Sequence, residues 1–302
     1  MLYPVSVCAE MFTGVYTALV TPFKRGELDE PALKKLIELQ VKAGVDGIVP
    51  VGTTGESPTV DYDEHVRIVE LAVRYAKGRC KIIAGTGANS TEEALFLTLS
   101  AEQAGADGSL QVCPYYNKPS QEGLHAHFSE IAKATKLPII LYSIPSRCGI
   151  EIGVPTVVRL AADCPNIICI KEAGGDADRV SRLRAALPNK FTILSGDDSL
   201  TLPFMAVGAK GVISVASNLI PRQLTKMVHS HLKSDLKGAL KLHEKYFPLF
   251  RDLFIETNPV PAKAALAMLG LVREEYRLPL VKMNPENRRQ LRATLKATGV
   301  LK

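Results

Sequence analysis

The sequence predicts an α/β fold, a (β/α)8 barrel with a C-terminal helical appendage, and three observations lead to this class. Eight apolar, β-branched runs recur roughly every 20 to 35 residues within residues 1–220. Amphipathic stretches separate them, and such alternation is typical of parallel strands joined by helical crossovers. The runs are almost continuously apolar, which indicates strands buried on both faces. Eight strand–helix units in one chain match a closed barrel.

The expected strands follow one another along the chain. They span residues 15–23, 47–52, 81–87, 108–116, 139–144, 167–173, 191–196 and 211–217. The alternative is an open doubly wound sheet, but its nucleotide-binding fingerprint is incomplete, because GTGANS ends in Ser90 where a third glycine is needed. No P-loop pattern occurs either. The barrel is therefore favoured over the open sheet.

Helices are expected between these strands. In residues 30–43 and 61–77, apolar side chains recur at three- and four-residue spacing and share one helical face. Asp61 and Ser90 are each followed by a glutamate three residues later, which is the pattern of a capping box. Both residues therefore predict the start of a helix.

The C-terminal part of the chain contains no strand pattern. Residues 221–302 are expected to form about four helices packed on the barrel, and their breaks are predicted at Pro248, Pro259, Pro261, Pro279 and Pro285. No Gly/Ser-rich stretch separates them from the barrel, which we place at residues 1–220. Residues 1–11 are expected to form a short extension before the first strand.

Composition favours a cytoplasmic protein. The chain has 302 residues with 46% hydrophobic content, enough for a large core. No apolar stretch approaches the ~20 residues that span a bilayer, and the N-terminus lacks the features of a signal peptide. None of the six cysteines forms a CxxC pair or a zinc-spaced cluster. Reduced, largely buried thiols in the cytoplasm fit this pattern best.

Positive charge is concentrated toward the C-terminus. The net charge is +6, and residues 222–302 hold 16 Lys or Arg against 7 Asp or Glu. Such a region raises the possibility of nucleic-acid binding. However, the basic residues are dispersed at helical spacing, and the chain has no tryptophan. A solvated helical face explains them better, and neither a nucleic-acid nor a membrane partner is expected.

Polar residues follow the expected strands at the end where a barrel forms its active site. Lys171 ends the apolar run NIICIK. Other strands end in GTTGES (52–57), PYYNKPS (114–120), YSIPSR (142–147) and SGDD (195–198). Each motif alone has an ordinary explanation, such as a turn or a lysine that reaches water. Together on one rim, they suit an anionic carbonyl substrate.

Lys171 is the candidate nucleophile. A lysine is rarely buried unless it is paired or used in chemistry, and burial lowers the pKa of an amine. At an unperturbed pKa near 10.4, only about one amine in a thousand is neutral at pH 7.4, a handicap of roughly 4 kcal/mol. An apolar strand recovers much of it, and a neutral amine can form a Schiff base with a ketone.

The other rim residues supply the remaining chemistry. Tyr142 lies at the same level on the neighbouring strand and could deliver a proton to the carbinolamine. Gly52 and Gly55 allow close backbone approach, so the amides and hydroxyls of the two threonines between them could hold a carboxylate. Arg147 could bind a second carboxylate bidentately.

These motifs resemble those of the dihydrodipicolinate synthase family, in the class I pyruvate-dependent aldolase superfamily. The resemblance runs from about Met11 to the C-terminus and rests on GTTGES, GTGAN, CPYYNKPSQEGL, YSIPSRCG, IKEAGG, LSGDD and GVISV in the family's order. It implies Schiff-base condensation of pyruvate with L-aspartate 4-semialdehyde in lysine and diaminopimelate biosynthesis. It also implies a lyase without metal or organic cofactor, assembled as a homotetramer, a dimer of dimers.

The resemblance implies catalytic roles for four residues. Lys171 forms the imine with pyruvate. Tyr142, Thr53 and Tyr116 form a proton relay, with Tyr116 supplied by a neighbouring subunit. Each of these residues stands in a motif that matches the family.

Substrate-binding roles follow in the same way. Thr54 helps to bind the pyruvate carboxylate, and Arg147 binds the carboxylate of the semialdehyde. Gly196 and Ile213 line the pocket through backbone groups. Two positions depart from the common pattern, Ser143 and Cys148. Neither transfers a proton in this scheme, so the assignment stands.

L-Lysine is a candidate effector. In relatives that lysine inhibits, its site lies at the tight dimer interface, and the matching positions are Ser57, Pro58, Tyr62, His65, Asn89, Glu93 and Tyr115. Glu93 could pair with the effector's ammonium. Tyr62 replaces a histidine that is common among bacterial relatives, and position 58 varies among them. We therefore expect weak or absent inhibition by lysine.

Other functions remain open from the sequence. An N-acetylneuraminate lyase or a 2-keto-3-deoxy sugar-acid aldolase would share Lys171 and Tyr142, but Arg147 and the pair Tyr115–Tyr116 suit a short carboxylated aldehyde better than a polyol. A catalytically silent barrel that binds keto acids or lysine is a further alternative. Such a barrel would be expected to lack Lys171 or Tyr142, and both are present.

Overall fold

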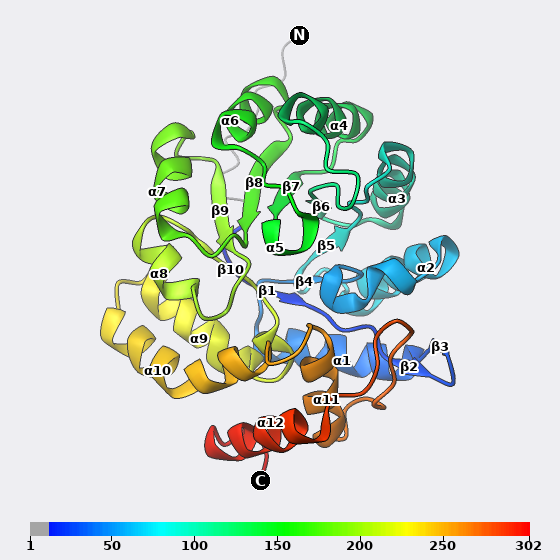
Figure 1. Ribbon diagram of the computed structural model, residues 1–302, viewed down its shortest axis with the longest axis vertical. Helices are drawn as coiled ribbons and strands as arrows, with labels where there is room; N and C mark the ends of the chain where they lie inside the picture. The colour runs from blue at the N-terminus through cyan, green and yellow to red at the C-terminus, as the bar shows by residue number, and fades with distance from the viewer. Residues whose placement is uncertain (1–11) are drawn as a thin grey trace.

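The computed structural model describes residues 12–302 and contains eight parallel strands closed into a barrel (Figure 1). These strands are β1 (Gly14–Ala18), β4 (Gly47–Val49), β5 (Lys81–Gly85), β6 (Gly108–Val112), β7 (Ile139–Ser143), β8 (Ile167–Glu172), β9 (Thr192–Ser195) and β10 (Gly211–Ser214). The first strand pairs with both β4 and β10, which closes the sheet. The predicted barrel is confirmed, while the expected extension and Cys8 lie outside the described residues.

Several strands end earlier than predicted. The strand expected at 15–23 ends at Ala18, four residues before Pro22, and the strand expected at 108–116 ends at Val112, just before Pro114. Proline has no N–H to donate to a strand ladder, so neither run can continue through it. The residues beyond each strand form loops at the barrel mouth instead.

A two-stranded hairpin follows the first strand and was not predicted. It consists of β2 (Phe23–Lys24) and β3 (Glu27–Leu28), which pair antiparallel. Arg25 and Gly26 in the turn have φ angles of 59° and 83°. Positive φ at both central residues is the requirement of a tight hairpin turn, and glycine meets it without strain.

Eight α-helices of at least six residues lie around the described barrel. They are α1 (Glu30–Ala43), α2 (Tyr62–Ala76), α3 (Thr91–Ala104), α4 (Gln121–Ala134), α6 (Val154–Asp163), α7 (Ala177–Ala186), α8 (Thr201–Ala206) and α9 (Pro221–Leu232). Asp61 and Ser90 cap α2 and α3 as predicted, accepting from the main-chain N–H groups of Glu64 and Glu93. The Glu64 side chain does not complete the capping box of α2, because its carboxylate pairs with Arg277 instead.

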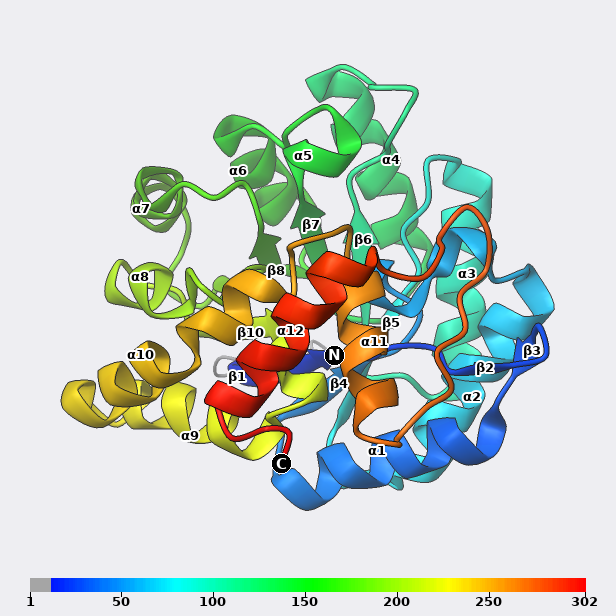
Figure 2. The same cartoon turned by 60° about the horizontal axis from the view of Figure 1, so that its bottom comes forward.

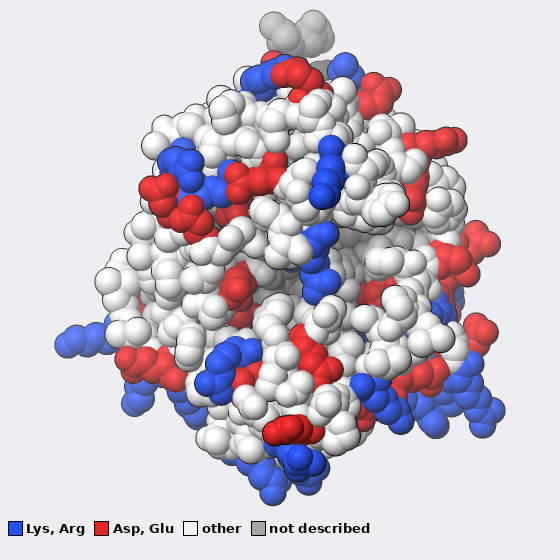
Figure 3. Space-filling model, viewed as in Figure 1, with Lys and Arg blue, Asp and Glu red and all other residues white. Residues whose placement is uncertain are grey.

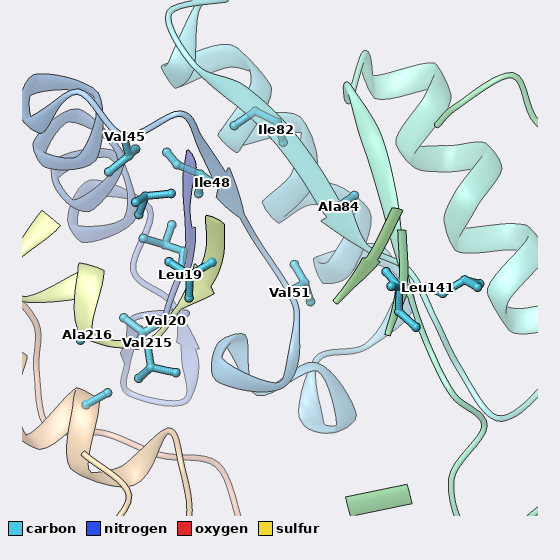
Figure 4. Packing of buried hydrophobic residues seen from close by; sticks show 14 of the residues in the cluster. Leu19, Val20, Val45, Ile48, Val51, Ile82, Ala84, Leu141, Val215 and Ala216 are labelled. Carbon is cyan, nitrogen blue, oxygen red and sulfur yellow. The ribbon is translucent and has the colours of Figure 1, made fainter. Parts of the chain in front are cut away.

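The core has two layers. The larger one lies between the strands and the surrounding helices, and Figure 4 shows part of it, including Leu19, Ile48 and Val51. The smaller one fills the barrel interior and contains Tyr142 and Ile213. Because each strand is packed on both sides, it reads as a continuous apolar run in the sequence.

Three helices follow α9, which itself packs against β1 and α1. They are α10 (Leu236–Asp252), α11 (Val260–Met268) and α12 (Pro285–Ala297). Figure 2 shows α12 alongside α11, and the two are in contact. The four predicted C-terminal helices are therefore present, while the division of the chain at residue 220 stays a prediction.

One predicted helix break is wrong. Pro248 lies inside α10, which continues through it to Asp252. Proline costs a helix one hydrogen bond and crowds the preceding turn. The neighbouring Tyr246, Leu249 and Phe250 are buried, so tertiary packing outweighs the local preference. Among residues 12–302, no helix has the length and hydrophobicity needed to cross a bilayer.

Candidate active site

A cavity of about 260 Å³ lies at the carboxyl ends of the barrel strands. Figure 3 shows a hollow near the centre of this face, with basic side chains at its edge. The cavity is lined by seven of the eight residues predicted to be catalytic or substrate-binding, namely Thr53, Thr54, Tyr142, Arg147, Lys171, Gly196 and Ile213. The eighth residue, Tyr116, is not part of its lining.

Lys171 extends from β8 into this cavity. Its side chain is 6% exposed, and its Nζ lies 4.0 Å from the centre of the Tyr142 ring. Gly196 makes room for it, because a Cβ atom there would stand 2.9 Å from Lys171 Cε and 2.6 Å from Ala173 Cβ. A glycine at position 196 is therefore what the extended lysine requires.

The electrostatic environment favours the neutral amine of Lys171. Burial lowers its pKa to about 7, and the Arg147 guanidinium acts in the same direction. The nearby Asp198 carboxylate opposes this shift and raises the pKa of the amine. A large fraction of the amine is thus in the nucleophilic form near neutral pH.

Asp198 is itself buried and ties two strand ends together. Its carboxylate accepts from Ser214 Oγ at 2.5 Å and from the N–H groups of Val215 and Ala216 at 3.0 and 2.8 Å. Burial raises its pKa to about 6 despite these bonds. It thereby fixes the end of β10 beside Ile213. The sequence showed Asp198 only as part of the SGDD motif.

Tyr142 lies beside Lys171 in the cavity lining. It pairs with Lys171 across β7 and β8, so the predicted level of the two residues is correct. Burial raises the pKa of its hydroxyl above the ordinary value for tyrosine, while the neighbouring Arg147 and Thr53 side chains act in the opposite direction. The phenol is therefore protonated at neutral pH, with a hydroxyl partner within reach.

The loop after β4 presents the two threonines. A short 3-10 helix runs from Thr53 to Gly55. Glu56 follows it with its backbone in the left-handed conformation. Thr21 Oγ1 donates to the Gly55 carbonyl at 2.7 Å, which holds the loop against the end of β1. The Thr54 side chain is buried and accepts a hydrogen bond at 3.0 Å from Nδ2 of Asn258.

Arg147 lies on α5 (Pro145–Cys148), a short helix that directly follows β7. Its Nη2 donates to the main-chain carbonyl of Asn258 at 3.0 Å. The next residue, Cys148, is buried and donates its S–H to the carbonyl of Cys113. Both thiols have raised pKa values because they are buried. The five cysteines within residues 12–302 are all free.

Tyr116 stands apart from the cavity. Its side chain is 90% exposed, and its φ angle of 72° places it in the left-handed region. Its neighbour Tyr115 does line the cavity. Thus one copy of the chain does not bring Tyr116 to its own Lys171.

Sequence reasoning missed the C-terminal contribution to the cavity. Phe254 and Asn258, from the segment between α10 and α11, lie in the lining. Asn258 meets a residue 204 positions earlier in the chain. Neither residue belongs to a recognisable local pattern, so no signal in the sequence alone could have found them.

A second, more open depression adjoins the cavity. Five of the seven residues expected at an effector site line it, namely Ser57, Pro58, Tyr62, Glu93 and Tyr115. The other two lie outside its lining. Asn89 donates to the Tyr115 carbonyl at 3.2 Å, and His65 is buried, with its pKa lowered to about 4 by desolvation.

Known proteins similar to this chain carry a consistent name. Residues 11–298 match the Dihydrodipicolinate synthetase family. A protein of Aquifex aeolicus (strain VF5) named 4-hydroxy-tetrahydrodipicolinate synthase is 52% identical, over 95% of this chain and 97% of its own length.

Solved structures agree with these relatives. The 4-hydroxy-tetrahydrodipicolinate synthase of Methylacidiphilum fumariolicum SolV superposes with a TM-score of 0.95 at 56% identity, covering 95% of this chain and 96% of that one. DHDPS from Cyanidioschyzon merolae, solved with lysine bound, has a TM-score of 0.94 at 42% identity and covers 97% of this chain and 100% of that one.

Proposed function

The chain belongs to the dihydrodipicolinate synthetase family and catalyses the 4-hydroxy-tetrahydrodipicolinate synthase reaction, and from this premise we propose that Lys171 is the residue that forms the imine with pyruvate. The reaction, a lyase activity, condenses pyruvate with L-aspartate 4-semialdehyde in lysine and diaminopimelate biosynthesis. The observation that carries the proposal is a buried lysine amine, with a pKa near 7, inside the barrel cavity.

The first half of the reaction uses the Lys171 amine and a proton donor. The neutral amine attacks C2 of pyruvate and forms a carbinolamine. Tyr142, which lines the cavity together with Thr53, protonates the leaving hydroxyl, and water departs as the C=N bond forms. Thr54 binds the pyruvate carboxylate. Loss of a proton from the methyl group then gives an enamine.

The second half forms a carbon–carbon bond and closes the ring. The enamine carbon attacks the aldehyde of the semialdehyde, whose carboxylate Arg147 binds. The amino group of that substrate then attacks the imine carbon, and its new C–N bond replaces the bond to Lys171. Gly196 and Ile213 are in the lining of this cavity, and their proposed role is to face the adduct with backbone groups.

Trapping the imine tests this assignment directly. Incubation with pyruvate and borohydride is expected to add one reduced pyruvate to the chain. Peptide mapping should then place the adduct on Lys171, whose amine is the buried one in the cavity. An adduct on any other peptide would contradict the proposal.

The rate of trapping is expected to depend on pH in a specific way. Below about 7 the folded-state amine is protonated, so the rate should rise about tenfold per pH unit; above about 7 it should level off. Borohydride trapping in stopped-flow mixing, at pH 5.5 to 9.5 and saturating pyruvate, measures this. A rate that keeps rising up to pH 9.5 would indicate an ordinary exposed amine.

We further propose that Tyr116 completes the site of a neighbouring copy in a homotetramer that is a dimer of dimers. Its exposure in one copy supports this role. Tyr62 and Phe96 are also exposed, and their rings lie 5.6 Å apart. Such an aromatic surface is typical of an interface between subunits.

We also propose a cytoplasmic location for the protein. The free cysteines support it, because disulfides are rare in that compartment.

L-Lysine is proposed to bind in the second depression with little effect on the rate. Glu93 offers a carboxylate for its ammonium, but Tyr62 stands where relatives commonly have a histidine, and His65 lies buried away from the lining. Initial rates are therefore expected to fall less than about twofold in millimolar lysine. A steep fall to near zero would overturn this expectation, and a Glu93→Gln variant would then show whether the effect passes through this depression.

A further inference from the structure

Asn258 connects the two parts of the cavity assigned above to different substrates. Its Nδ2 donates to Thr54 Oγ1 at 3.0 Å, on the pyruvate side. Its main-chain carbonyl accepts from Arg147 Nη2 at 3.0 Å, on the semialdehyde side. The residue is 5% exposed and lines the cavity. One residue of the C-terminal segment therefore contacts both substrate-binding side chains.

The direction of the Thr54 bond has a chemical consequence. A threonine hydroxyl carries one proton to donate and two lone pairs that accept. Because Thr54 Oγ1 accepts from the Asn258 amide, its own proton stays free for another acceptor. A carboxylate has only acceptors and needs such a donor. The amide of Asn258 thus holds the hydroxyl in the state that a keto-acid carboxylate requires.

The segment that carries Asn258 is firmly attached to the same loop as Thr54. Lys263, on α11, forms an ion pair with Glu56 at 2.5 Å, and both side chains are fully buried. The other carboxylate oxygen of Glu56 accepts from the main-chain N–H of Arg277 at 3.1 Å. Glu56 is two residues after Thr54, so these two bonds join the C-terminal segment to the loop close to the hydroxyl.

We propose that Asn258 is a positioning residue that directs the Thr54 hydroxyl toward the pyruvate carboxylate and braces Arg147 through its main-chain carbonyl. This proposal rests on the substrate roles given above. It assigns part of pyruvate recognition to the C-terminal segment, outside the barrel loops.

Two substitutions separate the functions of the side chain and the carbonyl. Asn258→Ala removes the amide but keeps the carbonyl, so the KM for pyruvate should rise about fivefold to tenfold while the KM for the semialdehyde stays within about twofold. Asn258→Asp would accept the Thr54 proton and add charge beside a carboxylate. Its KM for pyruvate should rise by about 30-fold or more.

A matched control adds the same charge elsewhere. Asn284 caps α12 by accepting from the N–H of Glu286, and a carboxylate can accept that bond equally well. Asn284→Asp should therefore leave both KM values unchanged. Thermal unfolding of each variant checks that the fold is retained.

The outcome distinguishes this proposal from the assignment of Lys171. Borohydride trapping at saturating pyruvate should still label Lys171 in the Asn258 variants, with half-saturation moved to higher pyruvate concentrations. If Lys171 is labelled but half-saturation in Asn258→Asp stays within twofold of the parent, the positioning role is wrong. An equal rise in both KM values for Asn258→Ala would indicate general loosening, and would also reject it. If the unsubstituted protein shows no label on Lys171 at any pyruvate concentration, the assignment of Lys171, on which this proposal rests, is wrong.

Discussion

Replacing Lys171 by alanine is expected to lower kcat by a factor on the order of 10⁴ or more, because no other lysine within residues 12–302 lines the cavity to form the imine. The variant should also show no mass increment after pyruvate and borohydride. Steady-state rates with both substrates measure the first effect, and intact-mass analysis the second. Lys190→Ala, which removes an exposed lysine, serves as the control and should retain both properties. Turnover preserved in Lys171→Ala would reject the imine mechanism.

The same variant reveals which copy of the chain supplies Tyr116. A mixture of Lys171→Ala with Tyr116→Phe chains, unfolded and refolded together, forms mixed assemblies. If Tyr116 acts across an interface, one site in each mixed pair has both Lys171 and a tyrosine from its neighbour, so activity should exceed that of either variant alone. If Tyr116 acts within its own chain, no site is complete and the mixture stays as inactive as its components.

The barrel could be predicted because its evidence is local. A strand buried on both faces is a continuous apolar run, and each of the eight runs contains its observed strand to within one residue. The pairing of Tyr142 with Lys171 also follows from the fold, because consecutive strands of a barrel are neighbours and their carboxyl ends share one rim. The functional residues at that rim could therefore be predicted from the sequence.

Features that depend on distant partners could not be predicted. Asn258 and Lys263 meet residues 204 and 207 positions earlier, and nothing in the stretch TNPVPAK indicates either contact. The helix through Pro248 and the short hairpin at 23–28 are similar cases. In the first, packing outweighs a local rule; in the second, two-residue strands are too short to show a period.

The buried pair of Lys263 and Glu56 is the feature whose loss should most affect stability. The Lys263 ammonium also lies 4.3 Å from the centre of the Phe23 ring. Burial lowers the pKa of Lys263, while Glu56 acts in the opposite direction and favours its charged form. Lys263→Met would leave the Glu56 carboxylate buried without its cation. Such losses cost about 3–5 kcal/mol, which for a chain of this size lowers Tm by on the order of 10 °C.

Thermal unfolding of two further variants identifies the cause of that loss. Lys263→Met combined with Glu56→Gln removes the uncompensated charge and keeps an acceptor for the Arg277 N–H, so it should recover part of the stability. Arg159→Met breaks the exposed pair of Arg159 with Glu122 and should change Tm little, because solvent screens such pairs. A Tm for Lys263→Met as high as that for Arg159→Met would mean that the buried pair contributes no more than a surface pair. The attachment of the C-terminal segment to the GTTGES loop would then have to come from the remaining bonds of Asn258 and Arg277.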